Sequence, residues 1–154
     1  AATTTSKASN GVVEEIQLQT LQTLTHSDGA WMEETLLTVS GPNLHLHLIN
    51  SLSLSRDGRA LAVGVAYDSS NAVGINGDAA NVTEDSTASG AVNLYRRDGT
   101  TWRHSAYLKA PKPHKLAKFG SSVALSSDGK TLAASDNNQP SSEALQIANA
   151  VYLY

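Results

Sequence analysis

A long polar segment between two apolar runs carries the side chains best suited to chemistry. Within residues 66–90, carboxylate and amide oxygens alternate with glycines, and the candidate ligands are Asp68, Asn76, Asp78 and Asp85. Such oxygen ligands suit a hard cation such as calcium. The competing interpretation is a polar surface loop, in which Asp and Asn side chains make local turn hydrogen bonds. The sequence therefore predicts a candidate calcium site and leaves the plain loop open.

The same segment contains a glycosylation acceptor triplet. Asn81, Val82 and Thr83 match the Asn-x-Thr pattern, which makes Asn81 a candidate modification site on a surface loop. This pattern bears on function only in a eukaryotic chain that enters the secretory pathway.

Two tryptophans occupy matching sequence contexts. Trp31 and Trp102 each follow an Asp-Gly pair and precede an apolar run. This recurrence favours packing of each ring against a neighbouring sheet. The alternative is a platform on which a sugar ring stacks.

The sequence lacks the motifs of common hydrolases and nucleotide-binding enzymes. It contains no cysteine, so thiol catalysis, cysteine-ligated zinc and disulfides are excluded. It has no Gly-x-Ser-x-Gly, Walker or His-Glu-x-x-His pattern. The pairs Glu14-Glu15 and Glu33-Glu34 are adjacent, so on a strand their carboxylates face opposite ways and cannot act together. We therefore predict that the protein is not an enzyme.

The elements that position these residues recur along the chain. LSRDGRALAVG at 54–64 matches LSSDGKTLAAS at 125–135, 71 positions later, and the same offset separates the two tryptophans. A third match, at an offset of 59, joins AVNLY at 91–95 to AVYLY at 150–154. Three matches in one order indicate an internal repeat.

One complete repeat contains four predicted strands, near 48–55, 60–65, 91–96 and 101–109. Asp-Gly between apolar runs is a strong hairpin signal, because glycine accepts a positive φ and Asp tolerates one. The second strand is apolar throughout with small residues. It is therefore expected to be buried on both faces.

The predicted fold class is all-β, with β-propeller blades of four antiparallel strands. One such sheet cannot bury its own faces, but radial stacking can; a β-sandwich is the alternative. We predict a flexible tail or linker at 1–10, the last strands of one blade at 11–43, a complete blade at 44–110 and three strands of the next at 111–154. About two blades cannot close a ring. The chain is therefore expected to be part of a larger propeller or to combine with other copies.

The motif from Phe119 to Ala133, FGSSVALSSDGKTLA, closely resembles FG-GAP repeats, which form the N-terminal propeller of integrin α chains. GINGD at 74–78 and SGAV at 89–92 are similar to the longer form of this repeat. The resemblance covers 44–154 well and 15–39 weakly.

Three features depart from the family. Leu48-Ile49 replaces one Phe-Gly pair, and the integrin calcium loop has no clear counterpart. The Gly-Ala-Pro position reads GVA at 64–66 and SDN at 135–137.

The resemblance implies a non-catalytic ring that serves adhesion, protein–protein interaction or a structural role in a larger assembly, in an extracellular, cell-surface or other exported location. A carbohydrate-binding, lectin-like propeller is the alternative, and calcium is the cofactor to expect, if any. Expected partners are a protein or further copies that complete the ring, or a glycan. The formal net charge of −3 argues against nucleic acid as a partner. No run of 18 apolar residues occurs, so no membrane-spanning helix is expected.

Overall fold

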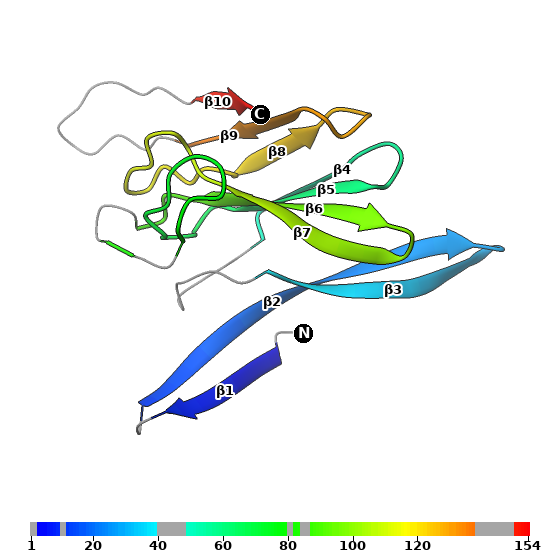
Figure 1. Cartoon of the computed structure of the whole chain (residues 1–154), viewed down its shortest axis with the longest axis horizontal. Coiled ribbons are helices and arrows are strands. Elements are labelled where there is room, and N and C mark those ends of the chain that lie inside the picture. Colours follow the sequence, from blue (N-terminus) through cyan, green and yellow to red (C-terminus); the bar gives the residue numbers. More distant parts are fainter. Residues whose placement is uncertain (1–2, 10–11, 40–48, 80–81, 84–86, 138–149) are drawn as a thin grey trace.

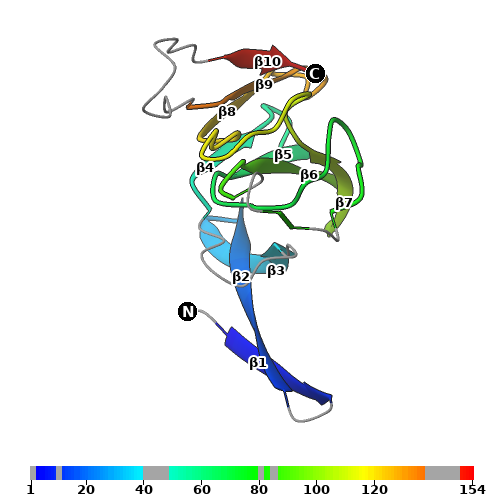
Figure 2. The ribbon, with the colours of Figure 1, turned by 90° about the vertical axis from the view of Figure 1, so that its left-hand side faces the viewer.

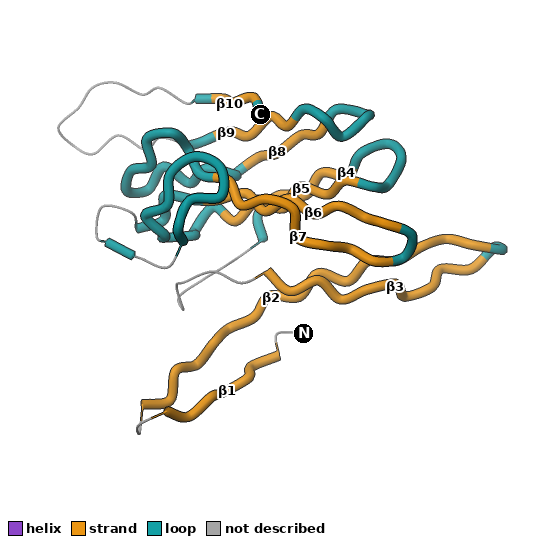
Figure 3. Tube along the Cα trace, viewed as in Figure 1, coloured by secondary structure: helices purple, strands orange, loops and turns teal. Residues whose placement is uncertain are grey.

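The computed structural model describes residues 3–9, 12–39, 49–79, 82–83, 87–137 and 150–154, with side chains from residue 21 onward. These residues form ten β-strands and contain no helix (Figure 3). The strands build three separate antiparallel sheets (Figure 1). The prediction of an all-β fold is therefore confirmed.

The first sheet has the order β1-β2-β3, with β1 at Thr3–Ser9, β2 at Val12–Ser27 and β3 at Ala30–Val39. β1 pairs with the first half of β2 and β3 with the second half. The β2–β3 turn places Asp28 and Gly29 at φ 51° and 80°, as a type I′ hairpin requires. Residues 1–10 were expected to be a flexible tail, whereas β1 lies there. Its threonines favour extended backbone.

The second sheet is a four-stranded meander in the order β4-β5-β6-β7. Its strands are Ser51–Leu54, Ala60–Val65, Ala91–Asp98 and Thr101–Leu108, close to the four strands expected from the repeat. Both faces of β5 are buried, as its small apolar sequence predicted. Residues 66–90 form the long connection from β5 to β6.

The third sheet has the order β10-β9-β8. Its strands are β8 at Ser122–Leu125, β9 at Leu132–Ser135 and β10 at Val151–Leu153. The three sheets are stacked, with the second between the other two (Figure 2).

Two apolar clusters fill the spaces between the sheets. The cluster between the first and second sheets includes Leu37, Val63 and Trp102. The cluster between the second and third includes Val92 and Phe119. The middle sheet therefore has both faces covered, whereas each outer sheet has one.

The backbones of the second and third sheets come unusually close. A Cβ on Gly64 would lie 2.0 Å from the Gly120 carbonyl oxygen, and one on Gly120 would lie 2.4 Å from the Ala91 carbonyl oxygen. Real Cβ atoms do not approach oxygen so closely, so only glycine fits at either position.

The sequence repeat is also a structural repeat. In the β4–β5 turn, Asp57 Oδ1 accepts hydrogen bonds from Ser55 Oγ at 2.6 Å and the Arg59 amide at 3.0 Å. In the β8–β9 turn, Asp128 makes the same two contacts, with Ser126 at 2.6 Å and Lys130 at 3.1 Å. Side-chain acceptors of this kind fix a turn locally.

A β-bulge also recurs at the same offset of 71. The register shifts between Thr23 and Leu24 in the β2–β3 pair, and between Leu94 and Tyr95 in the β6–β7 pair. A bulge turns the following side chains to the other face of the sheet. Equivalent residues of the first and second sheets therefore point to equivalent faces, before and after the bulge.

Candidate functional site

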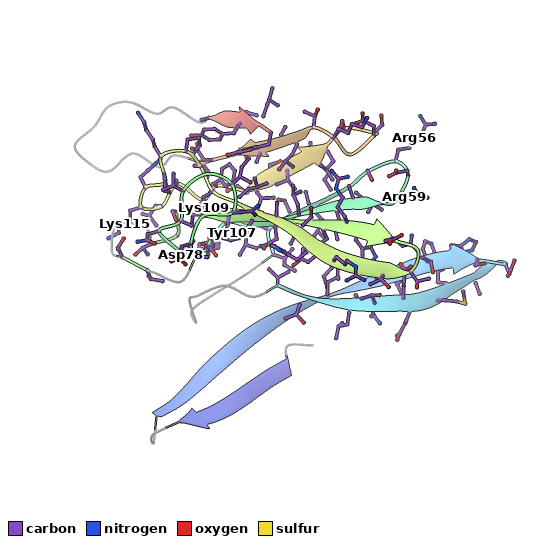
Figure 4. All side chains as sticks on the ribbon, viewed as in Figure 1. Arg56, Arg59, Asp78, Tyr107, Lys109 and Lys115 are labelled. Carbon is purple, nitrogen blue, oxygen red and sulfur yellow. The ribbon has the colours of Figure 1, made fainter. Side chains whose placement is uncertain are left out.

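A buried ion pair between Lys109 and Asp68 anchors the long 66–90 connection to the end of β7. Figure 4 labels Lys109 and Tyr107 of this group. Lys109 is fully buried, and its Nζ donates to Asp68 Oδ1 at 3.1 Å and to Ser89 Oγ at 2.7 Å. Tyr107 Oη donates to the same Asp68 oxygen at 2.8 Å, as does the Ser70 amide at 2.9 Å. Each buried charge is thus paired and hydrogen-bonded, which offsets its desolvation.

The carboxyl of Asp68 is kept ionised by these neighbours. Burial acts to raise its pKa, but the Lys109 ammonium, the Ser70 amide and the Tyr107 hydroxyl together hold the pKa below its ordinary value. Burial, followed by the Asp68 charge, strongly raises the pKa of Tyr107. Tyr107 therefore acts here as a neutral hydrogen-bond donor.

The four predicted calcium ligands have different surroundings. Asp68 is buried beside Lys109, whose positive charge disfavours a second cation there. Asn76 is exposed and accepts a hydrogen bond from the Tyr107 amide at 2.9 Å. Asp78 is exposed, and Asp85 lies outside the described residues. The described residues contain no group of three or more acidic, histidine or cysteine side chains that could hold a metal. Calcium binding stays a prediction.

Asn81, the predicted glycosylation site, also lies outside the described residues. Its neighbour Val82 is 41% exposed and bridges Ser70 through the backbone. Glycosylation stays a prediction.

An apolar pocket of about 350 Å³ lies between the first and second sheets. Leu52 and Leu54 of β4 contribute to its lining and are 48% and 56% exposed. Trp102 also lines it, and its buried Nε1 has no hydrogen-bond partner among the described residues. Leaving such a group unpaired costs about 1–3 kcal/mol. Sequence reasoning missed this pocket, although the alternating leucines of β4 are a sign of it.

The outer face of the first sheet exposes large apolar side chains, and we call it the head face: Trp31 and Leu36. Their exposed fractions are 71% and 59%. The repeat counterpart of Trp31, 71 positions later, is Trp102, which is only 9% exposed. Trp102 is buried because the first sheet covers it.

The outer face of the third sheet also exposes apolar side chains, and we call it the tail face: Val151 and Leu153. They are 68% and 74% exposed. Their repeat counterparts, 59 positions earlier, are Val92 and Leu94. Val92 is fully buried, and Leu94 packs against the same cluster.

The sheets that carry the head and tail faces are the two outer sheets of the stack (Figure 2). Leu37 and Tyr152, which are next to face residues in their strands, pack in the inner clusters, so the face residues point away from the second sheet.

The tryptophan prediction holds for one ring of the two. Trp102 packs in the cluster between the first and second sheets. Trp31 is exposed, with its ring centroid 5.1 Å from that of His26. The repeat predicted the same environment for both tryptophans, but of the two sheets that contain them only the second has a neighbour on that side.

No known family model, curated protein or solved structure matches this chain. Among the described residues, no helix could cross a membrane.

Proposed function

We propose that this chain is a non-catalytic, FG-GAP-type β-propeller segment that serves protein–protein interaction, adhesion or a structural role in a larger assembly. One observation carries the proposal. The two outer faces of the stack expose apolar residues at repeat positions whose counterparts are buried between sheets. Exposed apolar faces of this kind mark surfaces that another protein covers.

The internal repeat supports the assignment of the sheets as propeller blades. The second sheet has the four antiparallel strands of one blade, and its neighbours stack on its two faces. Equivalent turns and bulges recur at the repeat offset. The described residues form three stacked sheets, two of which have three strands each, and this is fewer than the four blades that usually close a ring. The proposed ring therefore contains further blades.

The resemblance to FG-GAP repeats implies an extracellular, cell-surface or otherwise exported protein, with a protein, a further copy or a glycan as partner. The oxygen-rich sequence of the 66–90 connection, and not the resemblance, supports a calcium site. Calcium would bind in the 66–90 connection through the exposed side chains of Asn76 and Asp78, with Asp85. Asp68 is less suited, because it already neutralises Lys109.

Hydroxyl-radical footprinting of the protein in its natural state tests the interaction function. We expect Trp31 and Leu153 to be oxidised in the dilute purified chain and protected in the natural assembly. Val73, which is 54% exposed in the long connection, serves as a control that should react equally in both. Equal oxidation of Trp31 and Leu153 in the two states would contradict the proposal.

A lectin is the alternative function, and the exposed indole of Trp31 favours it. A sugar stacked on this ring would shift the tryptophan emission. Titration with a panel of soluble glycans, with Trp31→Ala as control, separates the two functions. A saturable shift that disappears in the variant would favour the lectin, and no shift with any glycan would argue against it.

A further inference from the structure

We propose that copies of this chain associate head to tail, with the head face of each copy stacked on the tail face of the next. This inference rests on the proposed function, because it names the partner of the same apolar faces. The occupant of each face is thus a second copy of this chain. The interfaces between neighbouring sheets within one molecule show how two such faces pack against each other.

The interface between the second and third sheets defines the two kinds of face. The second sheet contributes Val92 and Leu94, which are the counterparts of the tail-face residues. The third sheet contributes Tyr152 and Tyr154, whose rings lie 5.6 and 6.2 Å from the ring of Phe119. Tyr154 is the counterpart of Tyr95. We call a face equivalent to the tail face tail-type and a face equivalent to the head face head-type. At this interface the tail-type face of the second sheet packs against the head-type face of the third sheet.

The interface between the first and second sheets has the same polarity. The first sheet contributes Leu21 and Leu37, which are 71 positions before Val92 and Leu108 of the other interface. The second sheet contributes Trp102, the counterpart of Trp31. Both internal interfaces therefore join a tail-type face to a head-type face.

The two open faces match these two types. The tail face repeats the side of the second sheet that the third sheet covers, and the head face repeats the side that the first sheet covers. The sheets that carry them lie on opposite sides of the second sheet (Figure 2), so the described residues of one chain cannot bring its own two faces together. A second copy can, and the resulting contact is heterologous, with different surfaces on the two partners.

Sedimentation of the purified chain tests the association. We expect concentration-dependent association of the wild type. Trp31→Arg on the head face and Leu153→Arg on the tail face should each weaken it by about 30-fold, as loss of a central apolar anchor does. Val73→Arg is the matched control and should associate like the wild type. Circular dichroism establishes that each variant is folded, and Leu36→Arg replaces Trp31→Arg if that variant is not.

Mixing the two impaired variants distinguishes head-to-tail contact from like-to-like contact. The Trp31→Arg chain keeps its tail face and the Leu153→Arg chain keeps its head face. An equimolar mixture should therefore form a one-to-one dimer with wild-type affinity, although each variant alone associates about 30-fold more weakly. A mixture that stays monomeric while the wild type associates would overturn the inference.

A wild-type chain that remains monomeric at all concentrations would also overturn the inference. If the footprint in the natural state still showed protection of Trp31 and Leu153, another protein would cover these faces. The proposed function would then stand without the second copy. Exposure of both residues in the natural state would remove the proposed function as well.

Discussion

Trp31 and Trp102 occupy the same position of one repeat and have opposite environments. Trp102 is 9% exposed, between two sheets, and Trp31 is 71% exposed, on an outer sheet. Their strand positions and the nearby bulges correspond, so the place of each tryptophan in its strand does not explain the difference. The presence of a neighbouring sheet does. The position of a residue in the repeat determines which face of the sheet its side chain is on. The presence of a neighbouring sheet on that face determines whether the side chain is buried.

The largest expected effect comes from the buried ion pair of the middle sheet. Lys109→Met leaves Asp68 as an unpaired buried charge and should lower the free energy of unfolding by about 4 kcal/mol. Urea denaturation followed by circular dichroism measures it. The exposed Lys112→Met is the control and should change stability by less than about 0.5 kcal/mol. Equal effects of the two variants would refute the anchoring role of Lys109.

The two tryptophans give the next largest contrast. In the dilute chain, Trp102→Ala should cost about 3 kcal/mol of stability because it empties a packed space between sheets. Trp31→Ala should change the stability by less than about 0.5 kcal/mol, because solvent already surrounds the ring. Thermal or urea unfolding of both variants checks the comparison. Similar losses in the two would contradict the assigned burial.

The close approach of the second and third sheets predicts a smaller loss. Gly64→Ala places a methyl group against the Gly120 carbonyl, and the sheets must separate to admit it. We expect a loss of about 2 kcal/mol, typical of overpacking. Gly29→Ala has open space around its Cβ but a positive φ, so it is the control for backbone strain alone. A larger loss in the control would contradict the steric account.

Acid should weaken the middle sheet through Asp68. Its pKa in the folded chain lies below its ordinary value, so its contribution to stability is present above about pH 4. The contribution is lost as the pH falls through the folded-state pKa. Urea midpoints between pH 7 and pH 3 should decline less steeply in Asp68→Asn than in the wild type. An unchanged slope would show that this carboxyl is not stabilised by its partners.

Much of the sheet architecture follows from the sequence. β5 was predicted at its observed bounds because small apolar residues between turn signals are typical of a strand buried on both faces. β1 was not predicted, because a run of small polar residues looks like a linker and its pairing with β2 is a matter of tertiary context.

The candidate site was harder to predict. The Lys109–Asp68 pair joins residues 41 positions apart, and an isolated lysine in a sequence resembles a solvated surface charge. The pocket forms where the two leucines of β4 are not covered by another described element, and the sequence alone does not say which face of a strand stays uncovered. Sequence alone identified the equivalence of Trp31 and Trp102, but burial also depends on what stacks beside each sheet.

Acrylamide quenching of single-tryptophan chains tests the central claim most directly. Trp102→Phe leaves only Trp31, and Trp31→Phe leaves only Trp102. In the dilute chain, Trp31 emission should be strongly quenched and Trp102 emission should be protected; in the natural assembly, both should be protected. Strong quenching of Trp102 in the dilute chain, or of Trp31 in the assembly, would contradict the view that the outer faces are stacking surfaces.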